Sequence, residues 1–257
     1  MTNCGLRIAN QKMTIRNPQS AILMSHSLYW LSLTLADVPD DDAWLGTAER
    51  TQLAGFRFSK RRREWRLGRW TAKQAISLYL GTERDFLTLS QLEIRAAPDG
   101  APGAFIEGHA APASFSISHS TGRSLCAVGE SATAVGCDLE WIKLHEENLV
   151  ADYFTAEETA LVARAPVSER PLVITLIWCA KESALKSLRQ GLRRDTRSVV
   201  VSLPEAKNED AWNSFTVRCL ESSGTFHGWW HVGAGFIQSI TSIVPASEPI
   251  DLARPSG

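Results

Sequence analysis

The chain has 257 residues, with 27 lysines and arginines against 28 aspartates and glutamates and a formal net charge of −1. Hydrophobic residues make up 44% of the chain and charged residues 21%, which is close to the average soluble domain. These proportions exclude an intrinsically disordered chain and a globally basic nucleic-acid-binding protein. The length predicts one large domain or two smaller ones, each able to bury a core.

The five cysteines are scattered, and none belongs to a C-x-x-C pair. This distribution argues against a disulfide framework and against a structural zinc site. The longest apolar stretch, residues 21–36, is interrupted by three serines and His26. It is shorter and more polar than a membrane span of about 20 apolar residues, and no small-residue cleavage site follows it. We therefore expect a soluble, cytoplasmic protein.

The order of the predicted elements indicates a mixed α+β fold. In chain order they are a strand over 21–35, a turn at 37–42 and a short helix, a long helix over 56–79, a loop or hairpin over 96–114, strands over 114–118, 124–128 and 134–142, helices over 155–163 and 172–189, and strands over 198–203, 214–220 and 229–244. Gly81 and Gly191 end the two long helices. Thr155 and Glu158 form a capping box. We find no repeat of fixed period, and the pattern favours a division near residue 132.

The predicted strand over 134–142 carries two carboxylates. Because side chains alternate along a strand, Asp138 and Glu140 point the same way, about 7 Å apart. The four residues between and beside them are expected on the buried face: Val135, Cys137, Leu139 and Trp141. Paired carboxylates suit a hard divalent cation with oxygen ligands. A half-exposed strand whose outer face is simply charged explains the same pattern without a metal.

The predicted helix over 172–189 carries a second group of polar residues. Trp178, Glu182 and Lys186 are spaced i, i+4, i+8 and therefore share one face of the helix. A surface salt bridge between Glu182 and Lys186 is the ordinary interpretation of such a pair. The tryptophan on the same face indicates that the face is at least partly covered.

A hydroxyl and an imidazole, Ser118 and His119, stand at the end of the apolar strand that begins at 114. Such a pair suits anion binding or acid–base chemistry, and a histidine whose hydrogen bonds are satisfied in a turn is the alternative. The sequence has no G-x-S-x-G elbow, so it does not support a serine hydrolase.

Residues 60–73 contain seven cations and one acid, Glu64. The helical spacing places some of these cations in one stripe, with an apolar stripe about a quarter turn away. The stripe consists of Arg62, Arg66, Arg69 and Lys73. We expect the helix to pack on the core while the cations line a rim that binds phosphate; a solvated charged face is the alternative. There is no Walker-type or G-x-G-x-x-G loop, so side chains would hold the phosphate.

Taken together and in this order, the motifs resemble the 4′-phosphopantetheinyl transferases of the larger, surfactin-synthetase-activating (Sfp-like) type. The matching stretches are residues 64–69, 115–120, 136–140 and 178–183. The resemblance implies a holo-carrier-protein synthase, which moves the phosphopantetheine arm of coenzyme A onto a serine of an apo acyl or peptidyl carrier protein and releases adenosine 3′,5′-bisphosphate. It also implies a monomer in fatty-acid, polyketide or nonribosomal-peptide biosynthesis, without nucleic-acid or membrane partners.

The resemblance further implies a pseudo-dimer of two similar subdomains with the active site in the cleft between them. The N-terminal subdomain would span 1–132 and carry the basic helix, and the C-terminal subdomain would span 133–257 and carry the metal carboxylates. Here Gly100-Ala101-Pro102 lacks the central lysine that members of the family often have. Arg95 is a candidate substitute for that lysine.

The resemblance assigns each candidate site residue a role. Mg²⁺, with Mn²⁺ as an alternative, would be bound by Asp138, Glu140 and Glu182. The catalytic residues would be Glu182, as the base that activates the carrier serine, together with Lys186 and His119. Coenzyme A would be bound by Ser118, His119 and Lys186, and on its 3′-phosphate side by Lys60, Arg62, Arg63 and Arg69.

Two other functions remain open on the residues alone. A non-catalytic RNA- or carrier-protein-binding module would use the basic segment 60–73, and a steep salt dependence of binding would reveal it. A metal-dependent phosphoesterase would use the carboxylates without an acceptor protein. The intact D-x-E and K-E pairs favour the transferase over the binding module.

Overall fold

The structure is a computed structural model that describes residues 26–146, 148–189, 194–204, 211–222 and 224–254. Its helices are α1 (Thr47–Ala54), α2 (Ser59–Leu80), α3 (Phe86–Gln91), α4 (Asn148–Tyr153), α5 (Ala156–Arg164) and α6 (Arg170–Ser187). Its strands are β1 (Tyr29–Thr34), β2 (Leu92–Ala96), β3 (Pro102–Ile106), β4 (His109–Ala110), β5 (Ser114–Ser120), β6 (Arg123–Gly129), β7 (Val135–Trp141), β8 (Val199–Ser202), β9 (Asn213–Cys219), β10 (Thr225–Gly233), β11 (Phe236–Ser242) and β12 (Ile250–Asp251). The predicted α+β class is confirmed.

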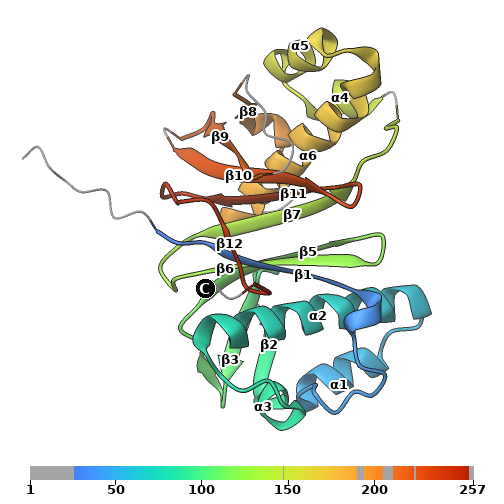
Figure 1. Cartoon of the computed structure of the whole chain (residues 1–257), viewed down its shortest axis with the longest axis vertical. Coiled ribbons are helices and arrows are strands. Elements are labelled where there is room, and N and C mark those ends of the chain that lie inside the picture. Colours follow the sequence, from blue (N-terminus) through green and yellow to red (C-terminus); the bar gives the residue numbers. More distant parts are fainter. Residues whose placement is uncertain (1–25, 147, 190–193, 205–210, 223, 255–257) are drawn as a thin grey trace, which may run out of the picture.

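Two sheets meet in the middle of the molecule, each with a long helix on its outer side (Figure 1). The first sheet has the strand order β12-β1-β6-β5 and packs against α2, and the second has the order β7-β11-β10-β9-β8 and packs against α6. A small third sheet, β2-β3-β4, lies beside α2. Strand β5 contacts β7, and an apolar cluster that includes Leu125, Leu139 and Ile240 joins the two large sheets. The polar groups at the β5–β7 contact therefore come from both halves of the chain.

Helix α2 forms where the pattern predicts it and ends at Gly81, which has a left-handed φ of 67°. Its apolar stripe packs on the first sheet, with Ala72, Ala75 and Ile76 fully buried. The backbone at Gly68 lies over β5, because a Cβ there would be 3.7 Å from the Ile117 side chain. The predicted packing face of this helix is confirmed.

The predicted rim of cations on α2 is wrong for its C-terminal part. The Lys73 side chain is fully buried, and its ammonium forms a 2.6 Å ion pair with Glu49. It also donates to the carbonyl oxygens of Trp44 and Leu89, at 3.0 and 2.9 Å. Arg69 Nε lies 3.9 Å from the same glutamate. The stripe turns inward here because α1 supplies a buried carboxylate that makes the burial of two cations tolerable.

The second half contains the same buried lysine–glutamate arrangement. Lys181 of α6 is fully buried, lies 2.8 Å from Glu158, and donates to the carbonyl oxygens of Thr196 and Val199 at 2.8 and 2.7 Å. Each glutamate also accepts a strand amide: Val201 N–H donates to Glu158 as Ile94 N–H donates to Glu49. The same arrangement therefore accommodates a buried lysine in each half of the chain.

Short sequences around the two buried lysines are also alike: Trp-Thr-Ala-Lys-Gln at 70–74 and Trp-Cys-Ala-Lys-Glu at 178–182. This correspondence was not predicted. Each half of the chain therefore carries the same short motif and the same buried ion pair, while the predicted subdomain boundaries, 1–132 and 133–257, stay a prediction. Where the second motif has Glu182, the first has Gln74, so only the second half carries this carboxylate.

Several elements differ from their predictions. The single strand predicted over 229–244 is the hairpin β10–β11, with a turn at Ala234 and Gly235, both at positive φ. Helices α3 and α4 and strand β2 were not predicted. The start of the strand predicted from 21 and the stop predicted at Gly191 lie outside the described residues. Strand β12 pairs in parallel with β1, which brings the end of the described chain back to the N-terminal sheet.

Among the described residues, none of the helices combines the length and the apolar character that a membrane crossing needs.

Candidate functional site

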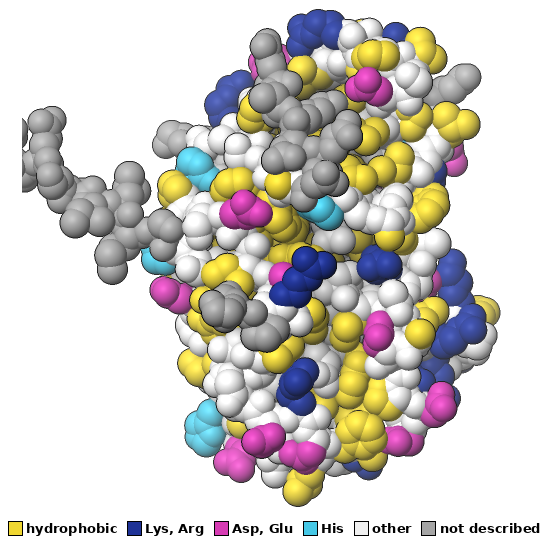
Figure 2. Space-filling model, viewed as in Figure 1, with side chains coloured by type: hydrophobic (Ala, Val, Ile, Leu, Met, Phe, Trp, Pro, Cys, Tyr) yellow, Lys and Arg dark blue, Asp and Glu magenta, His cyan; other side chains and the backbone are white. Residues whose placement is uncertain are grey.

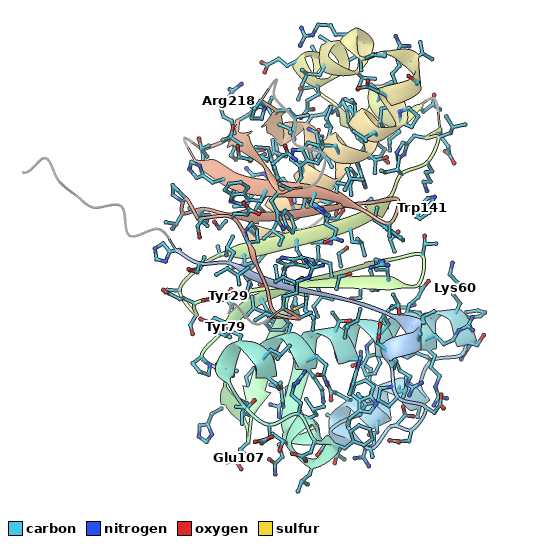
Figure 3. All side chains as sticks on the ribbon, viewed as in Figure 1. Tyr29, Lys60, Tyr79, Glu107, Trp141 and Arg218 are labelled. Atoms are coloured by element: carbon cyan, nitrogen blue, oxygen red, sulfur yellow. The ribbon has the colours of Figure 1, made fainter. Side chains whose placement is uncertain are left out.

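Strand β7 is buried on both of its faces from Val135 to Leu139, so the alternative of a half-exposed strand whose outer face is simply charged is wrong. Asp138 is buried because α6 packs directly on the strand at Gly136, where a Cβ would lie 1.9 Å from the Ser183 carbonyl oxygen. The absence of a side chain at Gly136 therefore lets the two backbones meet. Trp141, predicted to be buried, is 41% exposed at the end of the strand (Figure 3) and stacks edge-on against Phe236.

Asp138 is the centre of a polar cluster built from β5, β7 and α6. Its Oδ1 accepts hydrogen bonds from Ser118 Oγ at 2.8 Å and from Lys186 Nζ at 2.7 Å. Lys186 also donates to Ser118 Oγ at 3.0 Å. The Lys186 ammonium therefore does not form the surface salt bridge with Glu182 that its spacing suggested. It points to β7 and bonds groups from both halves of the chain.

Lys186 remains charged in this position. Burial alone would lower the pKa of its ammonium, but the Asp138 carboxylate outweighs burial, and the net pKa of Lys186 is raised. A fixed positive charge therefore stands beside the carboxylates at neutral pH.

The carboxylates of Glu182 and Glu140 belong to the same cluster. Burial, followed by repulsion from Asp138, raises the pKa of Glu182 to about 7, while Lys186 opposes the shift. Burial and then Asp138 also raise the pKa of Glu140, and a hydrogen bond from the Trp178 side chain acts in the opposite direction. Three carboxylates that repel one another, largely away from solvent, indicate a site that binds a cation.

Two buried oxygens in this cluster, Asp138 Oδ2 and Glu182 Oε1, have no hydrogen-bond partner among the described residues. A buried acceptor without a partner is costly, and a hard divalent cation takes carboxylate oxygens of this kind. Among the described residues, no group of three His, Cys, Asp or Glu side chains is close enough together to hold a metal ion by itself. The two unpaired carboxylate oxygens nevertheless fit Mg²⁺, which accepts few protein ligands and completes its coordination with substrate oxygens and water.

His119 and Ser118 differ in their access to solvent. His119 is exposed, and its ring lies 3.7 Å from the position of a Cβ on Gly68, so it stands between β5 and α2. Partial desolvation lowers the pKa of its imidazole, and Lys186 adds to this shift, while Glu64 opposes it. Ser118 is buried, and its hydroxyl donates a hydrogen bond to the Asp138 carboxylate.

The four predicted phosphate-binding cations of α2 divide into two sets. Lys60, 82% exposed, and Arg62 and Arg63, also exposed, lie in the first turns of the helix, where dark blue side chains gather in Figure 2. Arg69 is largely buried beside Glu49 and stacks on Trp65 with its guanidinium carbon 4.9 Å from the ring centroid. The structure brings none of the four into contact with the carboxylate cluster through a hydrogen bond or an ion pair among the described residues.

A pocket of about 1250 Å³ opens beside the cluster. Its walls are the segments 95–105, 110–111, 113–117 and 131–135, together with Lys186 at the end of α6 and Arg189 just beyond that helix. Lys186 lines the pocket and also bonds Asp138, so it connects the pocket with the carboxylate cluster, whose own three carboxylates are not among the lining residues. Arg189 was not among the predicted site residues, and the segment 96–114 was predicted only as a loop or hairpin.

Residues 134–231 match the model of the 4′-phosphopantetheinyl transferase superfamily. The chain is similar to that superfamily over this segment. The segment contains β7 and α6, and therefore all three carboxylates and Lys186. No curated protein matches the chain.

Twenty-two chains of solved structures match. One of them is the holo-[acyl-carrier-protein] synthase of Thermotoga maritima, with 19% sequence identity and a TM-score of 0.31, covering 51% of this chain and 76% of that one.

The raised pKa of Glu182 predicts how stability depends on pH in metal-free buffer. The folded state binds this proton more tightly than the unfolded state does, so its contribution to stability is lost as the pH rises through about 7. The loss between about pH 5 and about pH 8 is at most about 3 kcal/mol. Urea unfolding at both pH values should show a smaller loss for Glu182→Gln than for the unsubstituted protein, and equal losses would contradict the shift.

Proposed function

We propose that this protein transfers the 4′-phosphopantetheine arm of coenzyme A to a serine of an apo carrier protein, in the manner of the larger, Sfp-like transferases. The observation that carries the proposal is the buried cluster of Asp138, Glu140 and Glu182, which has two unpaired oxygens and lies beside Lys186. This lysine also lines a large pocket, and the three carboxylates lie within the segment that matches the superfamily. We further propose a cytoplasmic monomer, with Mg²⁺ preferred and Mn²⁺ as an alternative.

In this proposal Asp138, Glu140 and Glu182 hold Mg²⁺, which when bound polarises the pyrophosphate of coenzyme A and offsets the charge that builds up at phosphorus. Lys186, kept charged by Asp138, donates to a phosphate oxygen and stabilises the same charge. Ser118 holds the lysine and the aspartate in register through its two hydrogen bonds.

Glu182 suits the base that receives the proton of the carrier serine. A general base works best when its pKa lies near the operating pH, and the pKa of Glu182 is raised to about 7 before any metal binds. The serine oxygen then attacks the phosphorus, the bond to the adenosine-side phosphate breaks, and adenosine 3′,5′-bisphosphate leaves. His119, exposed between β5 and α2, is placed to donate to a phosphate at the mouth of the site.

The exposed start of α2 is proposed to serve the carrier protein and the 3′-phosphate side of coenzyme A. Lys60, Arg62 and Arg63 present positive charge to solvent, which complements an acidic partner and speeds its association. Arg69 would have to break its contact with Glu49 to reach a phosphate. We therefore consider it the least suited of the four cations to bind phosphate.

Incubation with coenzyme A, Mg²⁺ and a panel of apo carrier proteins from fatty-acid, polyketide and nonribosomal-peptide pathways tests the proposal. We expect adenosine 3′,5′-bisphosphate to be released in equal amount to the carrier protein that is modified. Hydrolysis of coenzyme A without any carrier would instead support the phosphoesterase.

The RNA-binding alternative loses support from the structure. Of the cations in 60–73, Arg66 donates to the carbonyl oxygens of residues 39–41, and Arg69 and Lys73 pair with Glu49. Fewer cations are therefore free for phosphates than the sequence indicates.

A further inference from the structure

The two large sheets meet at their edge strands, β5 and β7, and we call this contact the seam (Figure 1). The two strands belong to different sheets, and none of the ladders among the described strands joins them. A strand at the edge of a sheet has backbone amides without a ladder partner, and a buried amide needs another acceptor. The contact at the seam therefore depends on side chains.

Ser116 of β5 and Cys137 of β7 form a reciprocal pair across the seam. The Cys137 amide donates to Ser116 Oγ at 3.0 Å, and the Cys137 thiol donates to the carbonyl oxygen of Ser116 at 3.1 Å. Both residues are buried. Each of them contributes a backbone group and a side-chain group to the pair, so the two backbones are fixed relative to each other at this point.

The next residues along the two strands belong to the polar cluster. Ser118 lies two residues beyond Ser116 and therefore on the same face of β5, and Asp138 directly follows Cys137. The hydroxyl of Ser118 donates to Asp138 at 2.8 Å, and Lys186 donates to both of these residues. Strand β5 thus holds two consecutive residues of β7, the first through its backbone and the second through its carboxylate.

The two hydrogen bonds across the seam fix different things. The bond between Ser118 and Asp138 joins two rotatable side chains, which can adjust when a strand shifts. The bond from the Cys137 amide to Ser116 fixes the backbone of β7 itself. Because side chains alternate along a strand, a slip of one residue would turn Asp138 to the opposite face. Ser116 therefore acts on this carboxylate through the backbone.

We propose that Ser116 is a positioning residue: by accepting the Cys137 amide across the seam, it sets the position of Asp138 and with it the affinity of the carboxylate cluster for a divalent cation. This inference rests on the proposed function and deepens it. Residues that orient metal ligands without touching the metal change its affinity by about 10- to 100-fold when they are replaced.

The test measures Mn²⁺ binding to the full chain by electron paramagnetic resonance, without coenzyme A or a carrier protein, together with urea unfolding. Ser116→Ala removes the acceptor of the Cys137 amide, and Ser116→Thr keeps it. Because Ser116 also lines the large pocket, leaving out coenzyme A excludes an effect through substrate binding.

Ser124→Ala is the matched control. Ser124 is a buried serine of β6, and its hydroxyl donates to the carbonyl oxygen of Ser118 at 3.1 Å. This bond lies within the first sheet and does not cross the seam. The control therefore loses one buried hydrogen bond, as Ser116→Ala does, without releasing β7.

We expect Ser116→Ala to raise the dissociation constant of Mn²⁺ by about tenfold and Ser116→Thr to restore most of the affinity. The Mg²⁺ concentration that gives half-maximal transfer should rise in the same proportion in Ser116→Ala, and saturating Mg²⁺ should recover most of the rate. Ser124→Ala should lose a comparable amount of stability and keep the metal affinity.

Unchanged metal affinity in Ser116→Ala, or an equal loss in Ser124→Ala, would overturn the role of Ser116, while transfer by the unsubstituted protein would still uphold the proposed function. An unsubstituted protein that bound no Mn²⁺ and modified no carrier would overturn both.

Discussion

Replacement of Glu182 by glutamine is expected to lower the rate of phosphopantetheine transfer by about a thousandfold or more, because the proposed metal ligand and the proposed base are lost together. The same change should not destabilise the protein. Glu182 is buried, its Oε1 is unpaired, and its carboxylate is repelled by Asp138 and Glu140. In metal-free buffer near pH 8 we expect the free energy of unfolding to stay the same or to increase.

Loss of activity together with retained stability separates a functional role from a structural one. Rates at saturating coenzyme A and urea unfolding would be measured on the same preparations. Glu157→Gln is the matched control, because Glu157 is an exposed glutamate of α5 and its change should affect neither quantity. A Glu182→Gln protein that kept its full rate would contradict the assignment of this carboxylate.

Replacement of Lys181 by methionine should have the opposite signature. Lys181 belongs to the same W-x-x-K-E stretch as Glu182, but its ammonium pairs with Glu158 and with two carbonyl oxygens away from the carboxylate cluster. Removing one partner of a fully buried pair leaves an uncompensated charge, which costs about 3–5 kcal/mol. Urea unfolding should therefore show a severe loss of stability.

A second substitution makes this prediction specific. Adding Glu158→Gln to Lys181→Met removes the stranded carboxylate and should restore part of the lost stability. Lys60→Met is the control, since this lysine is 82% exposed. If Lys181→Met unfolded at the same urea concentration as the unsubstituted protein, the buried pair would not be a stabilising feature of the second half.

The sequence predicts the main elements and the identity of the carboxylates, because these depend on local patterns. The spacing of Trp178, Glu182 and Lys186 places them on one face of α6. This is the face that interacts with Glu140 and Asp138 of β7. The burial of Asp138 could not be predicted, since it depends on α6 packing on Gly136 across about fifty residues of chain.

Two other features depend on contacts that are distant in the chain. The inward turn of Lys73 requires the carboxylate of Glu49 from another helix, whereas a helical pattern alone favours a solvated rim. The ion pair between Arg189 and Asp99 joins residues that are 90 positions apart. The repeated motif around Lys73 and Lys181 was visible in the sequence, but only the repeated ion pair gives it meaning.

The most direct test is the intact mass of an apo carrier protein after incubation with coenzyme A and this protein. We predict a mass gain of one phosphopantetheine arm on the carrier, which requires a divalent metal and disappears with Asp138→Asn or Glu182→Gln. The Glu157→Gln protein should give the same gain as the unsubstituted one. A mass gain that persisted in both carboxylate variants, or no gain with any carrier of the panel, would contradict the account.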